Sequence, residues 1–314
     1  HLARRGHDAW VLDLRSSAGM PTAQQPWDFE QMGCQDIPLA VEAIVQRSGQ
    51  PQVDVVAHCM GAAMLSLGLF GDWARPPLHG RPVDLCPAAR ELLPQRLRRI
   101  VFSQVGPVLV MSPMNTARAW LFSWLVQFVP FGRFEFDPRR RSRADDLLDS
   151  VLQAVPYPRN DFWRENPPWP PWKRTPWAAV RHRMDALYGI TFSLPRVDDR
   201  VLERIDDFFG PLNLRTVAQV IAFARDHQVA DRTGCSSFIA RRFDRIAHCR
   251  VLGLHAVENG LVDISTRRLL FERLLATGIE GESIRLENAG HQDSLIGREA
   301  GATFARIATF LQQA

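Results

Sequence analysis

The amino-acid sequence predicts an α/β fold, with a mostly parallel sheet and flanking helices. Short β-rich segments alternate with helical patterns near both ends of the chain, and such alternation is typical of a parallel sheet. Of the 314 residues, 46% are hydrophobic and 23% are charged, as in an ordinary soluble globular protein. The expected strands lie within residues 8–14, 52–58, 98–106, 249–260 and 282–291, and the expected helices within residues 34–49, 61–70, 265–278 and 298–313.

The individual elements are predicted from local patterns. Residues 8–14 (DAWVLDL) are β-rich and are flanked by glycine and serine residues that bound a strand. Residues 34–49 carry apolar side chains at helical spacing and stop at Gly49. Residues 52–58 (QVDVVAH) form a continuous apolar run, which is typical of a strand buried on both faces of a parallel sheet.

The regular alternation stops between residues 111 and 245. This stretch is helical in patches and rich in tryptophan and proline, as in WRENPPWPPWKRTPW at 163–177. We therefore expect a long helical cap (111–245) inserted between an N-terminal part of the core, 1–110, and a C-terminal part, 246–314. Because the chain opens with HLARRGHDAW and has no initial methionine, we also expect the core to be truncated at its N-terminus.

The composition argues against several classes of protein. The net charge is only +4, from 38 basic and 34 acidic residues, whereas a nucleic-acid-binding protein concentrates far more positive charge on one face. The five cysteines form no CxxC pair, so we expect no metal site and no disulfide framework, and their usage fits a reducing cytoplasm. The longest apolar stretch, 119–131, is shorter than the roughly 20 residues of a membrane-spanning helix.

A cysteine lies where the expected strand 52–58 turns into a helix. Ala57 precedes Cys59 by two residues and Gly61 follows it by two, which is the spacing of a nucleophile elbow with Ala-His58-Cys-Met60-Gly in place of Gly-x-Ser-x-Gly. We expect the backbone N–H groups at the start of the helix to stabilise a thiolate and later an oxyanion. A buried structural thiol is the alternative, since free cysteine is among the most buried residue types.

Two later loops supply candidate partners for this cysteine. His291 follows the last expected strand in ENAGHQDSLIG, where a base would reach the apex of a neighbouring parallel strand. Polar residues follow the preceding strand, and the acid or orienting group is expected among Asn259, Glu258 and Asp263, with Asn259 best aligned. The order cysteine, acid or amide, histidine is the chain order of the triad in α/β-hydrolases.

In these motifs and in the order of its elements, the chain resembles the α/β-hydrolase superfamily over essentially its whole length. The AHCMGA elbow and the AGHQDSLIG loop look like those of the hydrolase-like domain fused to GMC flavoprotein oxidoreductases of the cholesterol-oxidase type. The resemblance implies that Cys59 is the nucleophile, that His291 is the base and that the Met60 N–H forms half of an oxyanion hole. It also implies an oxidoreductase domain in the intact chain, whose FAD would belong to that missing part.

These inferences lead to one expected function with two alternatives. The first is hydrolysis of a lipid-like or sterol-like acyl ester by a Cys–His pair. The alternatives are acyl transfer through the same thioester, or a non-catalytic binding domain attached to an oxidoreductase. The cap would contact the apolar ester and, as an alternative, a membrane surface. The expected substrate-contacting residues are Trp120, Phe122, Trp124, Leu125 and Phe128.

Overall fold

We analysed a computed structural model of the 314-residue chain. The structure describes residues 1–71, 87–125, 133–134, 142–143, 184, 189–202, 204–208, 210–213, 215–231 and 233–313.

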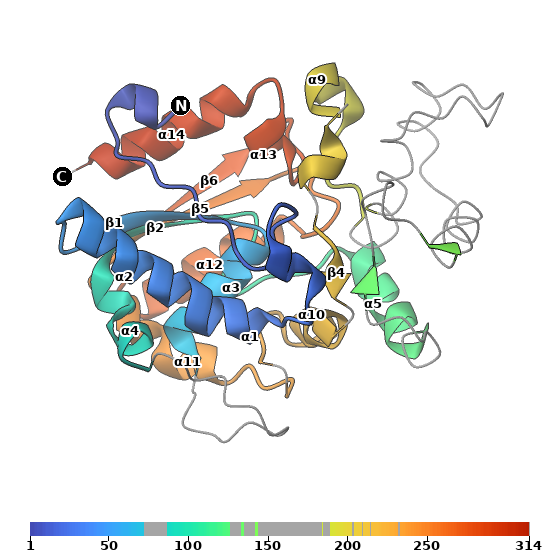
Figure 1. The fold of residues 1–314 in the computed structure, drawn as a ribbon, viewed down its shortest axis with the longest axis horizontal. Coiled ribbons are helices and arrows are strands. Elements are labelled where there is room, and N and C mark those ends of the chain that lie inside the picture. Colours follow the sequence, from blue (N-terminus) through green and yellow to red (C-terminus); the bar gives the residue numbers. More distant parts are fainter. Residues whose placement is uncertain are drawn as a thin grey trace.

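A four-stranded sheet forms the centre of the molecule (Figure 1). Its strands lie in the order β1-β2-β5-β6, and every neighbouring pair is parallel. The strands are β1 (Val53–His58), β2 (Leu97–Ser103), β5 (Arg250–Ala256) and β6 (Gly281–Leu286). Since parallel strands end at the same edge of the sheet, the residues that follow β1, β5 and β6 are brought together. The observed sheet confirms the predicted α/β fold class.

Helices cover both faces of this sheet, as Figure 1 shows. On one face, α14 (Ala300–Gln312) packs on Val101 and Leu252. The other face carries Ile100 and Phe102 and packs against three further helices, so successive residues of one strand serve two separate cores. These three helices are α2 (Ile37–Ser48), α3 (Met60–Phe70) and α12 (Ser265–Ala276).

The remaining elements are short or lie between β2 and β5. A π-helical segment, Met32–Asp36, leads into α2, and β3 (Arg133–Phe134) pairs antiparallel with β4 (Leu212–Asn213). The α-helices are α1 (Phe29–Gln31), α4 (Pro87–Leu92), α5 (Pro113–Leu125), α9 (Asp199–Leu202), α10 (Arg215–Asp226), α11 (Phe238–Arg242) and α13 (Asp293–Ile296). The 3₁₀ segments are η1 (Ala3–Arg5), η2 (Pro21–Gln24), η4 (Pro94–Arg96), η7 (Leu194–Arg196), η8 (Ile205–Phe208) and η9 (Phe243–Ile246).

The position of α3 is fixed by a close backbone approach. Gly68 of α3 lies against the carbonyl oxygen of Gly33, and Gly33 in turn lies against the carbonyl oxygen of Met64. A side chain at either glycine would collide with backbone, so the two segments could not pack at this distance. The contact holds the helix whose first residues form the predicted elbow.

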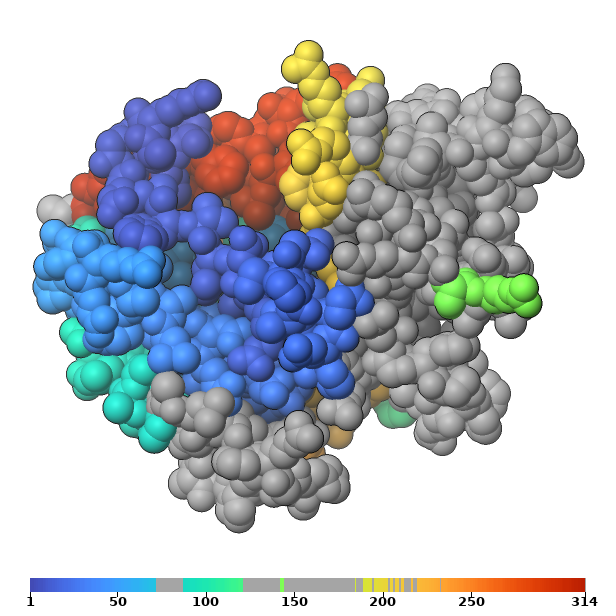
Figure 2. Space-filling view, in the orientation of Figure 1, coloured from blue at the N-terminus to red at the C-terminus, as the bar shows by residue number. Residues whose placement is uncertain are grey.

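The prediction of a strand at residues 8–14 was wrong. The segment is irregular and largely exposed, with Trp10, Val11 and Leu12 accessible and Val11 at 94%. It lies on the molecular surface in Figure 2, where the first residues are dark blue. The physical reason is that a strand needs a hydrogen-bonding neighbour, and among the described strands none pairs with this segment. A β-rich pattern alone was therefore not sufficient to predict a strand at residues 8–14.

The first strand of the sheet is also less buried than its sequence indicated. Five of the six residues of β1 are only partly buried, all except Ala57, whereas β2 is buried at all but one position. Within the described sheet β1 lies at an edge and pairs only with β2. A continuous apolar run is thus compatible with an edge strand.

The predicted division into core 1–110, cap 111–245 and core 246–314 stays a prediction. β2 and β5 are adjacent in the sheet although residues 104–249 separate them, and much of that segment lies outside the described residues. In the part of the chain that the structure describes, no helix has the length and apolar character needed to span a bilayer.

Candidate active site

Cys59 occupies a sharp turn between β1 and α3. Its backbone has φ 53° and ψ −126°, a conformation that L-residues rarely adopt. The turn is held at both sides, because the Cys59 N–H donates to the Ser103 carbonyl at 3.1 Å and the Cys59 carbonyl accepts from the Ala62 N–H at 3.0 Å. Holding a residue in such a region costs on the order of 1–3 kcal/mol and is typical of functional turns.

Space remains beside this turn. A side chain at Gly61 would meet no described atom within 4 Å, so closure of the turn does not require glycine there. Ala57, by contrast, is buried in the core beneath the turn. The open space lies on the first turn of α3, next to Cys59.

The Cys59 thiol is protonated at neutral pH. Burial raises the pKa of Cys59 to about 12, and the backbone N–H of Met60 offsets only part of that rise. The expected stabilisation of a thiolate by the helix start is therefore present but is smaller than the cost of desolvation. A nucleophile at this position needs a group that removes the proton during attack.

His291 is fully buried in the loop after β6, and its Nδ1 lies 3.0 Å from the amide Nδ2 of Asn259. Its Nε2 has no hydrogen-bond partner among the described residues. Burial, together with the neighbouring His58 and His255, holds the pKa of His291 well below its ordinary value. The imidazole is therefore neutral at physiological pH.

Asn259, three residues after β5, is fixed at both ends of its amide. Its Oδ1 accepts from the backbone N–H groups of Leu261 at 2.9 Å and Val262 at 3.0 Å. Its Nδ2 donates to the Oε1 of Gln104 at 3.1 Å, in addition to its contact with His291. Of the three candidates for the third group, the structure brings Asn259 to the histidine.

Glu258 and Asp263 make different interactions. Glu258 is exposed and forms an ion pair with Arg196, whose Nη1 lies 2.8 Å from Oε2. Asp263 accepts from the Ser265 N–H at 2.8 Å and so orders the start of α12. Neither carboxylate is hydrogen-bonded to His291, since the partner of its Nδ1 is Asn259.

The structure adds polar residues that the sequence interpretation missed. Gln104 is fully buried directly after β2, with φ 69°, and its Oε1 also accepts from the Ala256 N–H at 2.9 Å. His58 lies 3.0 Å from the Ser103 hydroxyl and its ring is tilted against that of His291, with centroids 5.1 Å apart. The signal was available, because Gln104 follows a strand just as Glu258 and Asn259 do.

The histidines near the strand ends share one electrostatic character. Burial lowers the pKa of His58 to about 4, and a hydrogen bond that its ring donates to the Gln292 side chain only partly opposes this. Burial, with a smaller contribution from Arg267, lowers the pKa of His255 to about 3. Both rings are therefore neutral at physiological pH, and the strand-end edge of the sheet holds neutral imidazoles beside a neutral thiol.

The predicted substrate-contacting residues fall on α5 or just after it. Trp120 is 63% exposed on this helix. Phe122, Trp124 and Leu125 belong to the same helix, and their side chains lie outside what the structure describes, as does Phe128 altogether. Their role as lining residues stays a prediction.

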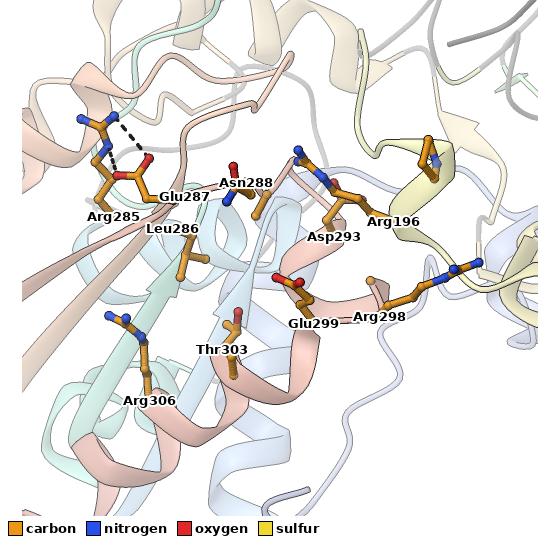
Figure 3. A pocket seen from close by; sticks show the side chains of 14 residues that line it. Arg196, Arg285, Leu286, Glu287, Asn288, Asp293, Arg298, Glu299, Thr303 and Arg306 are labelled. Carbon is orange, nitrogen blue, oxygen red and sulfur yellow. Dashed lines mark hydrogen bonds and ion pairs between the residues drawn. The ribbon is translucent and has the colours of Figure 1, made fainter. Parts of the chain in front are cut away.

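A pocket of about 340 Å³ lies between the end of β6 and the start of α14 (Figure 3). It is lined by Pro195, Arg196, Arg285, Leu286, Glu287, Asn288, Ala289, Asp293, Gly297, Arg298, Glu299, Ala302, Thr303 and Arg306. Figure 3 shows the Glu299 carboxylate between Arg306 and Arg298, and Arg285 paired with Glu287. Charges of both signs alternate around the wall, and neither Cys59 nor His291 lines it.

Among the described residues, no group of three histidine, cysteine, aspartate or glutamate side chains is arranged to hold a metal ion. The polar groups at the strand ends are instead a thiol, the imidazoles of three histidines, and two amides that hydrogen-bond to each other and to backbone.

No protein-family model matches the sequence, and no curated protein matches it. Among solved structures, the chain is similar to an α/β hydrolase from a Medee basin deep-sea metagenome library, with 13% identity and a TM-score of 0.40 over 88% of this chain and 71% of that one. It is similar to a monoacylglycerol lipase of Paleococcus ferrophilus, with 12% identity and a TM-score of 0.41 over 88% and 74%. It is also similar to homoserine O-acetyltransferase from Bacillus anthracis, with 10% identity and a TM-score of 0.45 over 93% and 67%. At this level of similarity the fold class rests on the sheet of the chain itself.

Proposed function

We propose that this protein is an enzyme of the α/β-hydrolase type that slowly cleaves acyl esters through Cys59, with His291 as its proton-transfer partner. One observation carries the proposal. Cys59 is held at φ 53° on the turn between β1 and α3, at the sheet edge where His291 is held by Asn259. A structural thiol needs no strained backbone, and Cys249, which is buried and has ordinary φ, shows what such a thiol looks like.

The reaction begins when the Cys59 sulfur attacks the ester carbonyl and a carbon–sulfur bond forms. The thiol proton passes to Nε2 of His291, and the carbonyl oxygen becomes an oxyanion that the Met60 N–H stabilises. Collapse of this intermediate breaks the carbon–oxygen bond, and the leaving alkoxide takes the proton from His291. Water then attacks the thioester, with its proton taken up by His291, and the acid and the Cys59 thiol are released.

Slow turnover follows from the state of the two reacting groups. The pKa of Cys59 lies near 12, so the resting group is a thiol whose proton must leave during attack. The pKa of His291 lies well below its ordinary value, so this histidine is a weak base. An alcohol or thiol acceptor can replace water in the last step, which gives acyl transfer by the same chemistry.

The proposed substrate is a lipid-like or sterol-like ester. Open space beside Gly61, on the first turn of the helix that follows Cys59, supports an acyl group near Cys59. The resemblance of the AHCMGA and AGHQDSLIG motifs supports a flavin-dependent oxidoreductase as a neighbouring domain of the intact protein. A cytoplasmic location accords with the wide spacing of the cysteines, which form no CxxC pair.

A second candidate function is that of a non-catalytic binding domain. One observation favours it: the group that contacts His291 is the amide of Asn259, which cannot balance an imidazolium with a full negative charge. In that case Cys59 and His291 would line a site that holds an ester or carboxylate without cleaving it.

Initial rates on p-nitrophenyl esters of increasing chain length separate the two functions. We expect the wild type to hydrolyse these esters slowly, and both Cys59→Ala and His291→Ala to lose at least about 10²-fold in kcat/KM. Cys249→Ala serves as the matched control, because it removes a thiol away from the elbow, and we expect it to keep the wild-type rate. Equal rates for wild type and Cys59→Ala would overturn the enzymatic proposal.

A further inference from the structure

The orientation of the Asn259 amide is determined by its surroundings. Two backbone N–H groups, those of Leu261 and Val262, point at one end of the amide at 2.9 and 3.0 Å. Only an oxygen can accept both bonds, and a flipped amide would place its N–H₂ group against two donors. The N–H₂ group therefore occupies the other end, 3.0 Å from Nδ1 of His291.

Gln104 fixes the same orientation a second time. Its Oε1 accepts from the Ala256 N–H at 2.9 Å, so the oxygen end of this amide is also determined by backbone. That oxygen lies 3.1 Å from the second polar atom of Asn259, which must be a donor. The two amides form one chain of hydrogen bonds that runs from the end of β5 to His291.

An amide N–H₂ group only donates, so Nδ1 of His291 must accept and cannot carry the proton. We infer that Asn259 fixes His291 in the tautomer with its proton on Nε2, so that this nitrogen of the resting imidazole is a hydrogen-bond donor rather than a base. This inference rests on the proposed function for its kinetic consequence. Asn259 is here a positioning residue, because it acts through His291 and not on the substrate.

This tautomer explains how the site binds and why it turns over slowly. The fully buried Nε2–H has no partner among the described residues and is available to a carbonyl or carboxylate oxygen of a ligand. Proton transfer from Cys59 requires the other tautomer, in which Nδ1–H would point at the N–H₂ group of Asn259. Only the small fraction of molecules in that form can begin a reaction. The observed rate therefore equals the rate of that form multiplied by this fraction.

The first experiment reads the tautomer directly and needs no substrate. We would record ¹⁵N NMR spectra of the histidine rings in the wild-type protein near neutral pH and assign His291 by comparison with His291→Ala. We expect a protonated Nε2 and an unprotonated, hydrogen-bonded Nδ1. A protonated Nδ1 at His291 would overturn the inference, whatever the enzymatic activity.

The second experiment replaces the hydrogen-bond donor that contacts Nδ1 of His291 by an acceptor. In Asn259→Asp the carboxylate keeps its bonds to Leu261 and Val262 and presents an acceptor to His291, so we expect Nδ1 to become protonated and kcat/KM to rise by about 10²–10⁴-fold. Asn288→Asp is the matched control, because it adds the same charge three residues from His291 on an exposed residue that does not contact Nδ1. We expect neither the tautomer nor the rate to change in that control.

The outcomes distinguish the two proposals. A switch of tautomer in Asn259→Asp without ester cleavage in any variant would overturn the proposed function and support the inference. Ester cleavage by the wild type that does not increase in Asn259→Asp, with an unchanged tautomer, would overturn the inference and support the proposed function. Because Gln104 Oε1 would face the new carboxylate, Asn259→Asp combined with Gln104→Ala is the variant to use if the single change does not fold.

Discussion

The turn after β1 and the loop after β5 lie at the same edge of the sheet but are built in opposite ways. At the turn, Cys59 has a strained backbone and open space beside it at Gly61. In the loop, the amide of Asn259 forms four hydrogen bonds and leaves no freedom of orientation. The strained backbone and the open space thus lie at the residue where a substrate would react. The rigid hydrogen bonds lie at the residue that would set the tautomer of His291.

The largest effect is expected in acid, because the strand that leads into each region carries a neutral histidine near its end. Burial lowers the pKa of His58 to about 4 and that of His255 to about 3, whereas the unfolded chain takes up these protons near pH 6.5. Stability is therefore intact above pH 6.5 and is lost as the pH falls toward the folded-state pKa values. At about pH 5 the two histidines together should lower the free energy of unfolding by about 4 kcal/mol.

Urea titrations at several pH values measure this loss, with His255→Leu as the control. Neither ring nitrogen of His255 has a hydrogen-bond partner among the described residues. The variant should therefore remove the contribution of His255, about 2 kcal/mol at pH 5, and keep the fold at neutral pH. An unchanged pH dependence in His255→Leu would contradict the burial of a neutral imidazole there.

The second prediction concerns the rigid loop. Asn259→Ala removes the acceptor of the Leu261 and Val262 N–H groups and the donor to Gln104 and His291. We expect the free energy of unfolding to fall by about 2–4 kcal/mol, since partly buried polar groups lose their partners. Chemical denaturation of the variant measures this, and a loss below about 1 kcal/mol would mean that the loop is not held by the amide.

The third prediction concerns the strained turn. Cys59→Gly and Cys59→Ala both remove the thiol, but only glycine adopts a positive φ without strain. We expect Cys59→Gly to be more stable than Cys59→Ala by about 1–2 kcal/mol in thermal and chemical denaturation. Equal stabilities of the two variants would show that the turn is relaxed in solution.

The smallest effect is expected at the neighbour of Asn259. Glu258 is paired with Arg196 at the surface, and exposed ion pairs of this kind contribute about 0–1 kcal/mol. Glu258→Gln should therefore change the stability by less than about 1 kcal/mol and leave the ester-cleavage rate as in the wild type. A large kinetic effect of this variant would reopen the question of which residue assists His291.

Much of the fold could be predicted from the sequence, because the apolar runs at β2 and β5 and the helical pattern at α2 each depend on local spacing. The strand at 8–14 could not, since whether a β-rich segment forms a strand depends on a partner that no local pattern reveals. The burial of β1 was overestimated for the same reason. Position in the sheet, rather than the number of apolar residues, decides how exposed a strand is.

The candidate site divides in the same way. Cys59, Asn259 and His291 were accessible to sequence reasoning because each follows a predicted strand, and parallel strands end at one edge. Gln104 follows a strand as well and was overlooked. The state of the groups could not be predicted, because the pKa of Cys59 depends on desolvation in the fold and the orientation of Asn259 depends on the backbone of Leu261 and Val262.

The most direct measurement of the central claim is the mass of the protein after brief exposure to an activated acyl ester. Acid quenching followed by intact-mass and peptide analysis would locate any acyl group on the four cysteines that the structure describes, Cys34, Cys59, Cys235 and Cys249. We predict one acyl group on Cys59, absent in Cys59→Ala and formed faster in Asn259→Asp. Acylation elsewhere, or none on Cys59 while ester is consumed, would contradict a nucleophilic role for this residue.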